Sequence, residues 1–79
     1  MTSFTVLLTS INDVKTFVNH ACAQNYDIDL VSGRYIIDAK SIMGIFSLDL
    51  AKPIKVELHA GQEEADTFKA LIKNAVVED

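Results

Sequence analysis

The fold of this chain is decided by residues 38–48, which read Asp38-Ala39-Lys40-Ser41-Ile42-Met43-Gly44-Ile45-Phe46-Ser47-Leu48. Ser41 is suited to be the N-cap of a short helix, because its hydroxyl can accept hydrogen bonds from the free amide groups of the first turn. Four bulky apolar residues follow it, and so short a helix cannot point all four into a core. We therefore expect part of the apolar surface formed by Ile42, Met43 and Phe46 to be exposed and to contact a partner.

Each of these residues also has a purely structural interpretation. Ser41 can be a helix cap and nothing more, and Met43 and Phe46 can be ordinary core residues. Gly44 can allow the close approach of a partner backbone, or it can only relieve crowding against the rest of the fold. The sequence leaves these alternatives open.

Outward from this stretch, the hydrophobic period alternates between two and about 3.6 residues. We expect a strand over residues 4–8, a hairpin over 27–39 with its turn at Ser32-Gly33, and a strand over 53–58. A helix should begin at Ser10, with Asp13 as its capping partner and Ile11, Val14, Phe17, Val18, Ala21 and Cys22 as its buried stripe. A last helix follows Gly61, with Glu63 and Glu64 in its first turn and a buried stripe of Ala65, Phe68, Leu71, Ile72 and Ala75 or Val76.

The expected element order is βαββαβα in a single domain over residues 1–79, which belongs to the α+β class. It implies an open-faced β-sandwich, a four-stranded antiparallel sheet with three helices on one face. The other face, which carries Val31, Ile36, Lys55, Glu57 and His59, should meet water or another subunit of a homodimer. Periodicity alone equally allows a ferredoxin-like small-molecule-binding domain.

Composition excludes several classes of function. The net charge of -4 and the pI near 4.9 argue against nucleic acid and anionic membranes as partners. One cysteine cannot form an internal disulfide, and the first residues show no basic segment ahead of an apolar run, so we expect a cytoplasmic protein. His20, His59 and Cys22 lack the spacing of metal ligands, so we expect no metal site and no cofactor.

From Phe4 to about Ala75, and most sharply over 38–48, the sequence resembles HPr, the histidine-containing phosphocarrier family of the bacterial sugar phosphotransferase system. The resemblance implies the fold just described and decides against the ferredoxin-like alternative. It also implies that Ser41 is a regulatory phosphorylation site, and that the apolar side chains after it form a docking face.

The sequence departs from the family pattern at the phosphocarrier loop. HPr proteins carry a loop resembling Gly-Ile-His-Ala-Arg-Pro before the first helix, whereas this chain has residues 9–13, Thr-Ser-Ile-Asn-Asp. Counted back from the helix, Ser10 takes approximately the place of the histidine and Asn12 that of the arginine. A transferable phosphoryl group needs a nucleophile such as imidazole, and His20 lies ten residues further on, about 15 Å along a helix. We therefore expect no catalytic residue and no enzymatic activity.

These features favour a non-catalytic regulatory or adaptor protein, similar in its missing histidine to the family branch typified by the catabolite-repression HPr homologue. A phosphate on Ser41 would add charge beside the apolar face, where Lys40 could pair with it. The partners expected are a transcriptional regulator or a phosphotransferase-system component, together with a serine kinase. The alternatives are a phosphocarrier that uses another acceptor and the ferredoxin-like domain.

Overall fold

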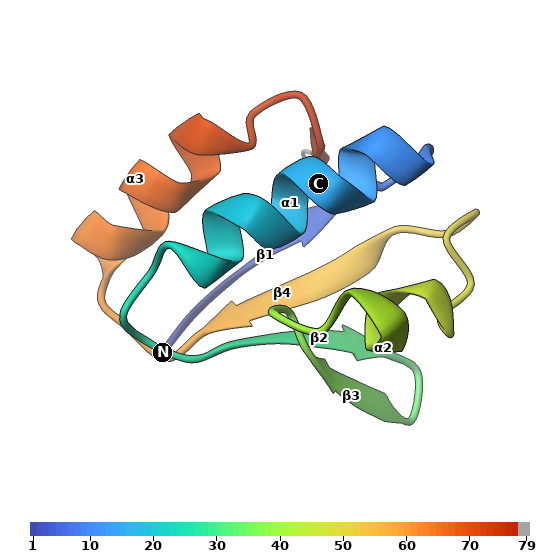
Figure 1. The fold of residues 1–79 in the computed structure, drawn as a ribbon. Coiled ribbons are helices and arrows are strands. Elements are labelled where there is room, and N and C mark those ends of the chain that lie inside the picture. The colour runs from blue at the N-terminus through green and yellow to red at the C-terminus, as the bar shows by residue number, and fades with distance from the viewer. Residues whose placement is uncertain (78–79) are drawn as a thin grey trace.

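Three helices lie against one face of an antiparallel sheet in the computed structural model, which describes residues 1–77 (Figure 1). Among these residues, no helix combines the length and the apolar character that crossing a membrane would require. The elements in chain order are β1 (Thr2–Val6), α1 (Ile11–Cys22), β2 (Ile28–Ser32), β3 (Tyr35–Asp38), α2 (Ile42–Phe46), β4 (Ile54–Leu58), α3 (Gln62–Leu71) and β5 (Val76–Val77).

The strand order in the sheet is β3-β2-β4-β1-β5, and every neighbouring pair is antiparallel. β4 lies in the centre, where Val56 pairs with Phe4 of β1 on one side and with Leu30 of β2 on the other. In a ferredoxin-like sheet the first and third strands pair in parallel, whereas here β1 and β3 are separated by β4 and β2. The expected open-faced arrangement is therefore confirmed, and the ferredoxin-like alternative is excluded.

The sheet has five strands where four were expected, because the chain after α3 returns to the sheet. α3 ends at Leu71, so the prediction that Ala75 or Val76 continues its stripe is wrong. Val76 and Val77 instead pair with Val6 and Thr5 at the otherwise open edge of β1. The amide of Leu7 extends this pairing by donating to the Ala75 carbonyl at 2.8 Å. β-branched residues suit this extended geometry better than a helix end.

The core lies between the sheet and the helices. Its fully buried large side chains come from all three helices, from three of the strands and from Leu8 after β1, and they are Val6, Leu8, Val14, Phe17, Ile28, Leu30, Ile45, Ile54, Val56, Leu58 and Phe68. The rings of Phe17 and Phe68 meet edge to face at 5.7 Å, which joins α1 to α3. The first strand spans residues 2–6 rather than 4–8, because its register is set by pairing with β4.

The expected stripe of α1 is correct in its middle and wrong at its ends. Val14, Phe17 and two further residues are buried, but Ile11 is 65% exposed and Cys22 is also exposed. The stripe gives the direction of the buried face, but only the middle turns lie over the sheet. Ile11 is therefore a surface residue that the periodicity placed in the core.

The open face of the sheet carries Lys55, Glu57 and His59, as expected, and each of them contacts another polar side chain there. Lys55 Nζ lies 3.2 Å from Glu57 Oε2, and His59 Nε2 lies 2.8 Å from Asp29 Oδ2. Both pairs are partly exposed, so each contributes little to stability. The open face is therefore polar around β4 and Asp29, whereas Val31 and Ile36 are apolar residues of the same face.

Candidate functional site

The segment between β3 and α2 is a tight turn that fixes the position of Ser41. The Asp38 carboxylate accepts the Lys40 amide at 2.9 Å, and the Asp38 carbonyl accepts the Ser41 amide at 3.0 Å. Ala39 is fully buried, and its amide donates to the Ile28 carbonyl at 2.9 Å. Ser41 is therefore held at the start of α2 by its neighbours on the strand side.

Ser41 is the N-cap of α2, as predicted from the sequence. Its backbone is extended, with φ of -104° and ψ of 102°, and its Oγ accepts the Gly44 amide at 3.2 Å. The residue is exposed, so the hydroxyl can be reached from solvent. Ser47, at the other end of the same helix, instead donates its hydroxyl to the Gly44 carbonyl. The two serines of this helix thus have opposite roles at its two ends.

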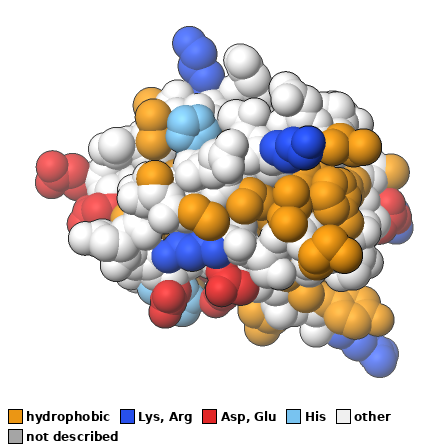
Figure 2. Space-filling view, in the orientation of Figure 1, with side chains coloured by type: hydrophobic (Ala, Val, Ile, Leu, Met, Phe, Trp, Pro, Cys, Tyr) orange, Lys and Arg blue, Asp and Glu red, His pale blue; other side chains and the backbone are white. Residues whose placement is uncertain are grey.

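The apolar residues after Ser41 divide between core and surface. Ile45 is fully buried and anchors α2, whereas Met43 is 77% exposed, Phe46 is 40% exposed and Ile42 is half-buried. We call Ile42, Met43 and Phe46 the α2 patch. Figure 2 shows hydrophobic side chains gathered on the side of the molecule where α2 lies. The expected exposure is confirmed, and the ordinary-core interpretation of Met43 is wrong.

Gly44 is required by close packing inside the protein. A Cβ at this position would lie 2.6 Å from Cγ2 of Ile37 on β3 and 3.2 Å from Oγ of Ser41. The first distance is far below ordinary van der Waals contact. Of the two interpretations of Gly44, crowding against the sheet is the one that the geometry supports.

Lys40 does not direct its ammonium group at Ser41. Its Nζ donates to the Gln24 carbonyl at 3.3 Å, just beyond the end of α1. Pairing with a phosphate on Ser41 would require this contact to be exchanged. The contact has a role of its own, because a lysine close to the last carbonyl groups of a helix is favourable there.

The start of α1 is the second position that the sequence singled out. Ser10 is the N-cap, and its Oγ accepts the Asp13 amide at 3.0 Å. The Asp13 carboxylate reaches one residue further back than in a reciprocal capping pair, and accepts the Thr9 hydroxyl at 2.9 Å and the Thr9 amide at 3.2 Å. The Thr9 hydroxyl lowers the pKa of the Asp13 carboxyl below its ordinary value. A negative charge is therefore held beside Ser10 at neutral pH.

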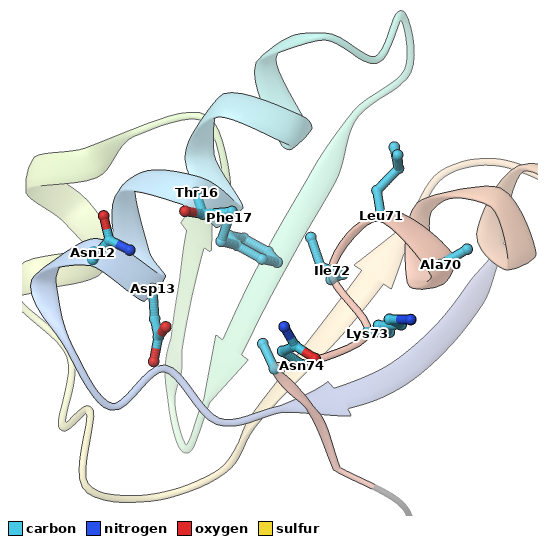
Figure 3. A pocket seen from close by; sticks show the side chains of 10 residues that line it. Asn12, Asp13, Thr16, Phe17, Ala70, Leu71, Ile72, Lys73 and Asn74 are labelled. Carbon is cyan, nitrogen blue, oxygen red and sulfur yellow. The ribbon is translucent and has the colours of Figure 1, made fainter.

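A cavity of about 250 Å³ lies beside this helix start. α1 forms one wall and the chain from the end of α3 forms the other (Figure 3). Its lining combines apolar and polar side chains, including Phe17, Asp13 and Asn12 from α1 and Lys73 and Asn74 after α3. No sequence pattern indicated this cavity, because Lys73 and Asn74 belong to a segment that we expected to be helical.

Both histidines lie away from the start of α1. His20 is in the last turn of that helix, and His59 follows β4 and contacts Asp29 on the open face. Within residues 1–77, no three His, Cys, Asp or Glu side chains are grouped so that they could hold a metal ion.

Comparisons with known proteins agree with this geometry. A protein-family model described as "PTS HPr component phosphorylation site" matches residues 12–77. The crystal structure of HPr-C-His from Thermoanaerobacter tengcongensis is similar, with 26% identity, a TM-score of 0.75 and coverage of 95% of this chain and 91% of that one.

Two further solved structures share the fold. One is the phosphocarrier protein HPr from Bacillus anthracis str. Ames, with 24% identity, a TM-score of 0.69 and coverage of 94% and 95% of the two chains. The other is the histidine-containing phosphocarrier protein of a Mycoplasma, with 16% identity, a TM-score of 0.71 and coverage of 92% and 89%. No curated protein matched the sequence.

Proposed function

Because the chain belongs to the HPr family of the phosphotransferase system, we propose that it is a regulatory or adaptor member that binds protein partners through the α2 patch. The observation that carries this proposal is the combination at α2 of an exposed N-cap hydroxyl on Ser41 with the exposed side chains of Met43 and Phe46. Phosphorylation of Ser41 is the proposed switch. The protein acts in this role without catalysing a reaction.

The switch acts through charge placed next to an apolar surface. A phosphate on Ser41 carries between one and two negative charges and three acceptor oxygens. The first turn of α2 contains no acidic residue, and the Gly44 amide that now donates to Ser41 can donate to a phosphate oxygen instead. The phosphate would then extend into solvent beside Met43. Lys40 is the nearest cation in sequence and would pair with it after releasing the Gln24 carbonyl.

The partner must combine two kinds of complementarity. An apolar groove would receive Met43 and Phe46, and an arginine at its rim would form charge-assisted hydrogen bonds to the phosphate. A transcriptional regulator or another phosphotransferase-system protein fits this description. The kinase that modifies Ser41 is the further partner that the proposal requires.

The start of α1 supports the non-catalytic part of the proposal. Counted back from the first helix, Ser10 and Asn12 take approximately the places where the family carries its phosphate-accepting histidine and its arginine, and we propose that no histidine fills that role here. A serine phosphate is a stable ester, so Ser10 cannot pass a phosphoryl group on as an imidazole does. The ionised Asp13 beside it would also repel an incoming phosphoryl group.

A phosphocarrier function is the competing candidate, and the family match favours it equally. Intact-mass analysis after two separate incubations distinguishes the two. With a serine kinase and ATP we expect one acid-stable phosphate, which is absent in Ser41→Ala and retained in the matched control Ser47→Ala. With enzyme I and phosphoenolpyruvate we expect none, and an acid-labile phosphate near one per chain would establish the phosphocarrier instead.

Partner binding tests the α2 patch. Ser41→Ala should abolish the binding that depends on phosphate, and Phe46→Ala should weaken it by removing apolar contact. Ile36→Ala is the matched control, because the exposure of Ile36 lies between those of Met43 and Phe46 but the residue belongs to β3. A partner retained equally by all three variants would show that Ser41 is only a helix cap.

A further inference from the structure

β3 is an edge strand with a free hydrogen-bonding side. It pairs only with β2 in the sheet formed by residues 1–77, and the register places Val31 opposite Ile36 and Leu30 opposite Ile37. The amide of Ala39 donates to the Ile28 carbonyl of β2. In an antiparallel pair the backbone groups face the neighbour at every second residue, so those of Ile37 also face β2. The N–H and C=O of Ile36 therefore point away from the sheet.

Two large apolar side chains of this edge are exposed. Tyr35 and Ile36 are each 68% exposed, whereas Ile37 is half-buried and Asp38 is charged. Exposed edges are normally protected by lysine, proline or a bulge. Residues 35–38, Tyr-Ile-Ile-Asp, contain no lysine or proline, and their register with β2 is unbroken. The shortness of the strand and the charge of Asp38 are the protections that remain.

The two charged residues that bracket this edge, Arg34 and Asp38, form no ion pair with the side chains of residues 1–77. Asp38 lies opposite Asp29, which in turn lies opposite Glu57, so three carboxylates form a row across the open face. Within residues 1–77, Asp29 is paired with His59 and Glu57 with Lys55, whereas Arg34 and Asp38 belong to neither ion pair. Among residues 1–77, the Asp38 carboxylate is bound only by the Lys40 amide.

We propose that β3 is a self-association edge, on which the β3 of a second copy of this chain pairs antiparallel about Ile36. The free N–H and C=O of Ile36 then bond to those of the second Ile36, and the two side chains lie opposite each other. In this register Asp38 of each copy lies level with Arg34 of the other, the turn residue that immediately precedes β3. Arg34 therefore meets Asp38 twice, which neutralises the carboxylate that its own sheet leaves unpaired.

This charge pattern selects a second copy over other strands. An antiparallel pair related by a two-fold axis needs opposite charges at equal distances on either side of its centre, and Arg34 and Asp38 each lie two residues from Ile36. The two sheets would join into one sheet whose centre is the β3 pair. An edge of four residues buries little area, so the dimer is weak, with a Kd on the order of 100 μM. This inference is independent of Ser41 and the α2 patch.

Sedimentation equilibrium over a range of concentrations tests the proposal. The wild-type mass should rise with concentration from 8.7 kDa toward twice that value. Ile36→Lys should weaken the dimer by about tenfold or more, because two ammonium groups then face each other at its centre. General repulsion between acidic chains predicts the opposite, since this change lowers the net negative charge.

Exchanging the charges at positions 34 and 38 gives the sharpest test of the proposed register. Each single variant, Arg34→Glu or Asp38→Arg, should be monomeric, because in its homodimer side chains of like charge would face each other. An equimolar mixture of the two variants should dimerise as the wild type does, because every opposed pair in the heterodimer is attractive. Lys15→Glu, on the exposed face of α1, is the control that matches Arg34→Glu in net charge and should leave the Kd unchanged.

Three results would each overturn the proposal. One is a wild-type protein that stays monomeric up to about ten times the expected Kd. The second is a dimer whose Kd is unaffected by Ile36→Lys and Arg34→Glu. The third is a mixture that fails to associate although far-ultraviolet circular dichroism shows both charge variants to be folded.

Discussion

Gly44→Ala offers the most direct test of how α2 is packed. Replacing glycine by alanine in a helix favours folding by about 1 kcal/mol through propensity alone. The new Cβ would lie 2.6 Å from Cγ2 of Ile37, and overpacking of this kind costs about 1–3 kcal/mol. Ile37 is β-branched and belongs to a paired strand, so it has little freedom to move away. We expect a net loss of about 1 kcal/mol in the free energy of unfolding.

A double-mutant cycle separates the two contributions. Ile37→Ala removes Cγ2, so in that background Gly44→Ala should stabilise the protein by about 1 kcal/mol. Ile37→Val keeps Cγ2 and should leave the cost of Gly44→Ala in place. The coupling between positions 37 and 44 should therefore be about 2 kcal/mol, which urea unfolding followed by circular dichroism can resolve. If Gly44→Ala stabilises the wild type and the Ile37→Ala variant equally, the proposed crowding does not exist.

Three further predictions concern the two helix starts. Ser41→Ala should cost about 1 kcal/mol in urea unfolding while Ser41→Asp keeps the fold, since aspartate also caps helices; equal stability of all three proteins would contradict the cap. Met43→Ala should change stability by less than about 0.5 kcal/mol, whereas Ile45→Ala should cost about 2–5 kcal/mol, so a large loss in Met43→Ala would contradict its exposure. Thr9→Val should raise the pKa of the Asp13 carboxyl, which a carbon-13 carboxyl titration measures, and an unchanged titration would refute the Thr9 contact. In the wild type, the contribution of the ionised Asp13 carboxylate to the free energy of unfolding should be lost as the pH falls through its pKa, which lies below 3.8.

The sequence predicted most of the fold because its signals are local and periodic. The cap at Ser41 needs only a hydroxyl before a short apolar run, and the buried middle of α1 needs only helical spacing at Val14 and Phe17. The turn at Gly33 was found for the same reason, since its φ of 60° is one that glycine adopts readily. Each of these features is determined by residues that are close to one another in the sequence.

The errors arose where tertiary contacts decide the structure. Ile11 continues the stripe of α1 but is exposed, because no sequence pattern shows how far the sheet extends beneath a helix. Val76 and Val77 form a strand because the edge of β1 is available beside them, and two residues are too few to show a period. The cavity beside Asn12 was missed for the same reason, since its second wall is the chain between α3 and that strand.

At the candidate site, the exposure of Met43 and Phe46 could be predicted from helix length alone. The direction of the Lys40 ammonium group could not, because its acceptor, the Gln24 carbonyl, is sixteen residues away in the chain. Nor did the sequence show that Ile37 would lie against Gly44. Sequence reasoning thus predicted the exposure of Met43 and Phe46 but not the contacts that hold the residues around them.

The interior position of β1 has a consequence for how the protein is made. β1 pairs with β4 and β5, which both come later in the chain, so this strand leaves the ribosome before either of its neighbours. Ile54, which pairs with Val6, is synthesised 48 residues after it, and at usual synthesis rates this is a delay of roughly 2–10 s. During that time the apolar side of residues 2–6 is uncovered. The nascent chain therefore offers chaperones a binding segment that the finished protein conceals.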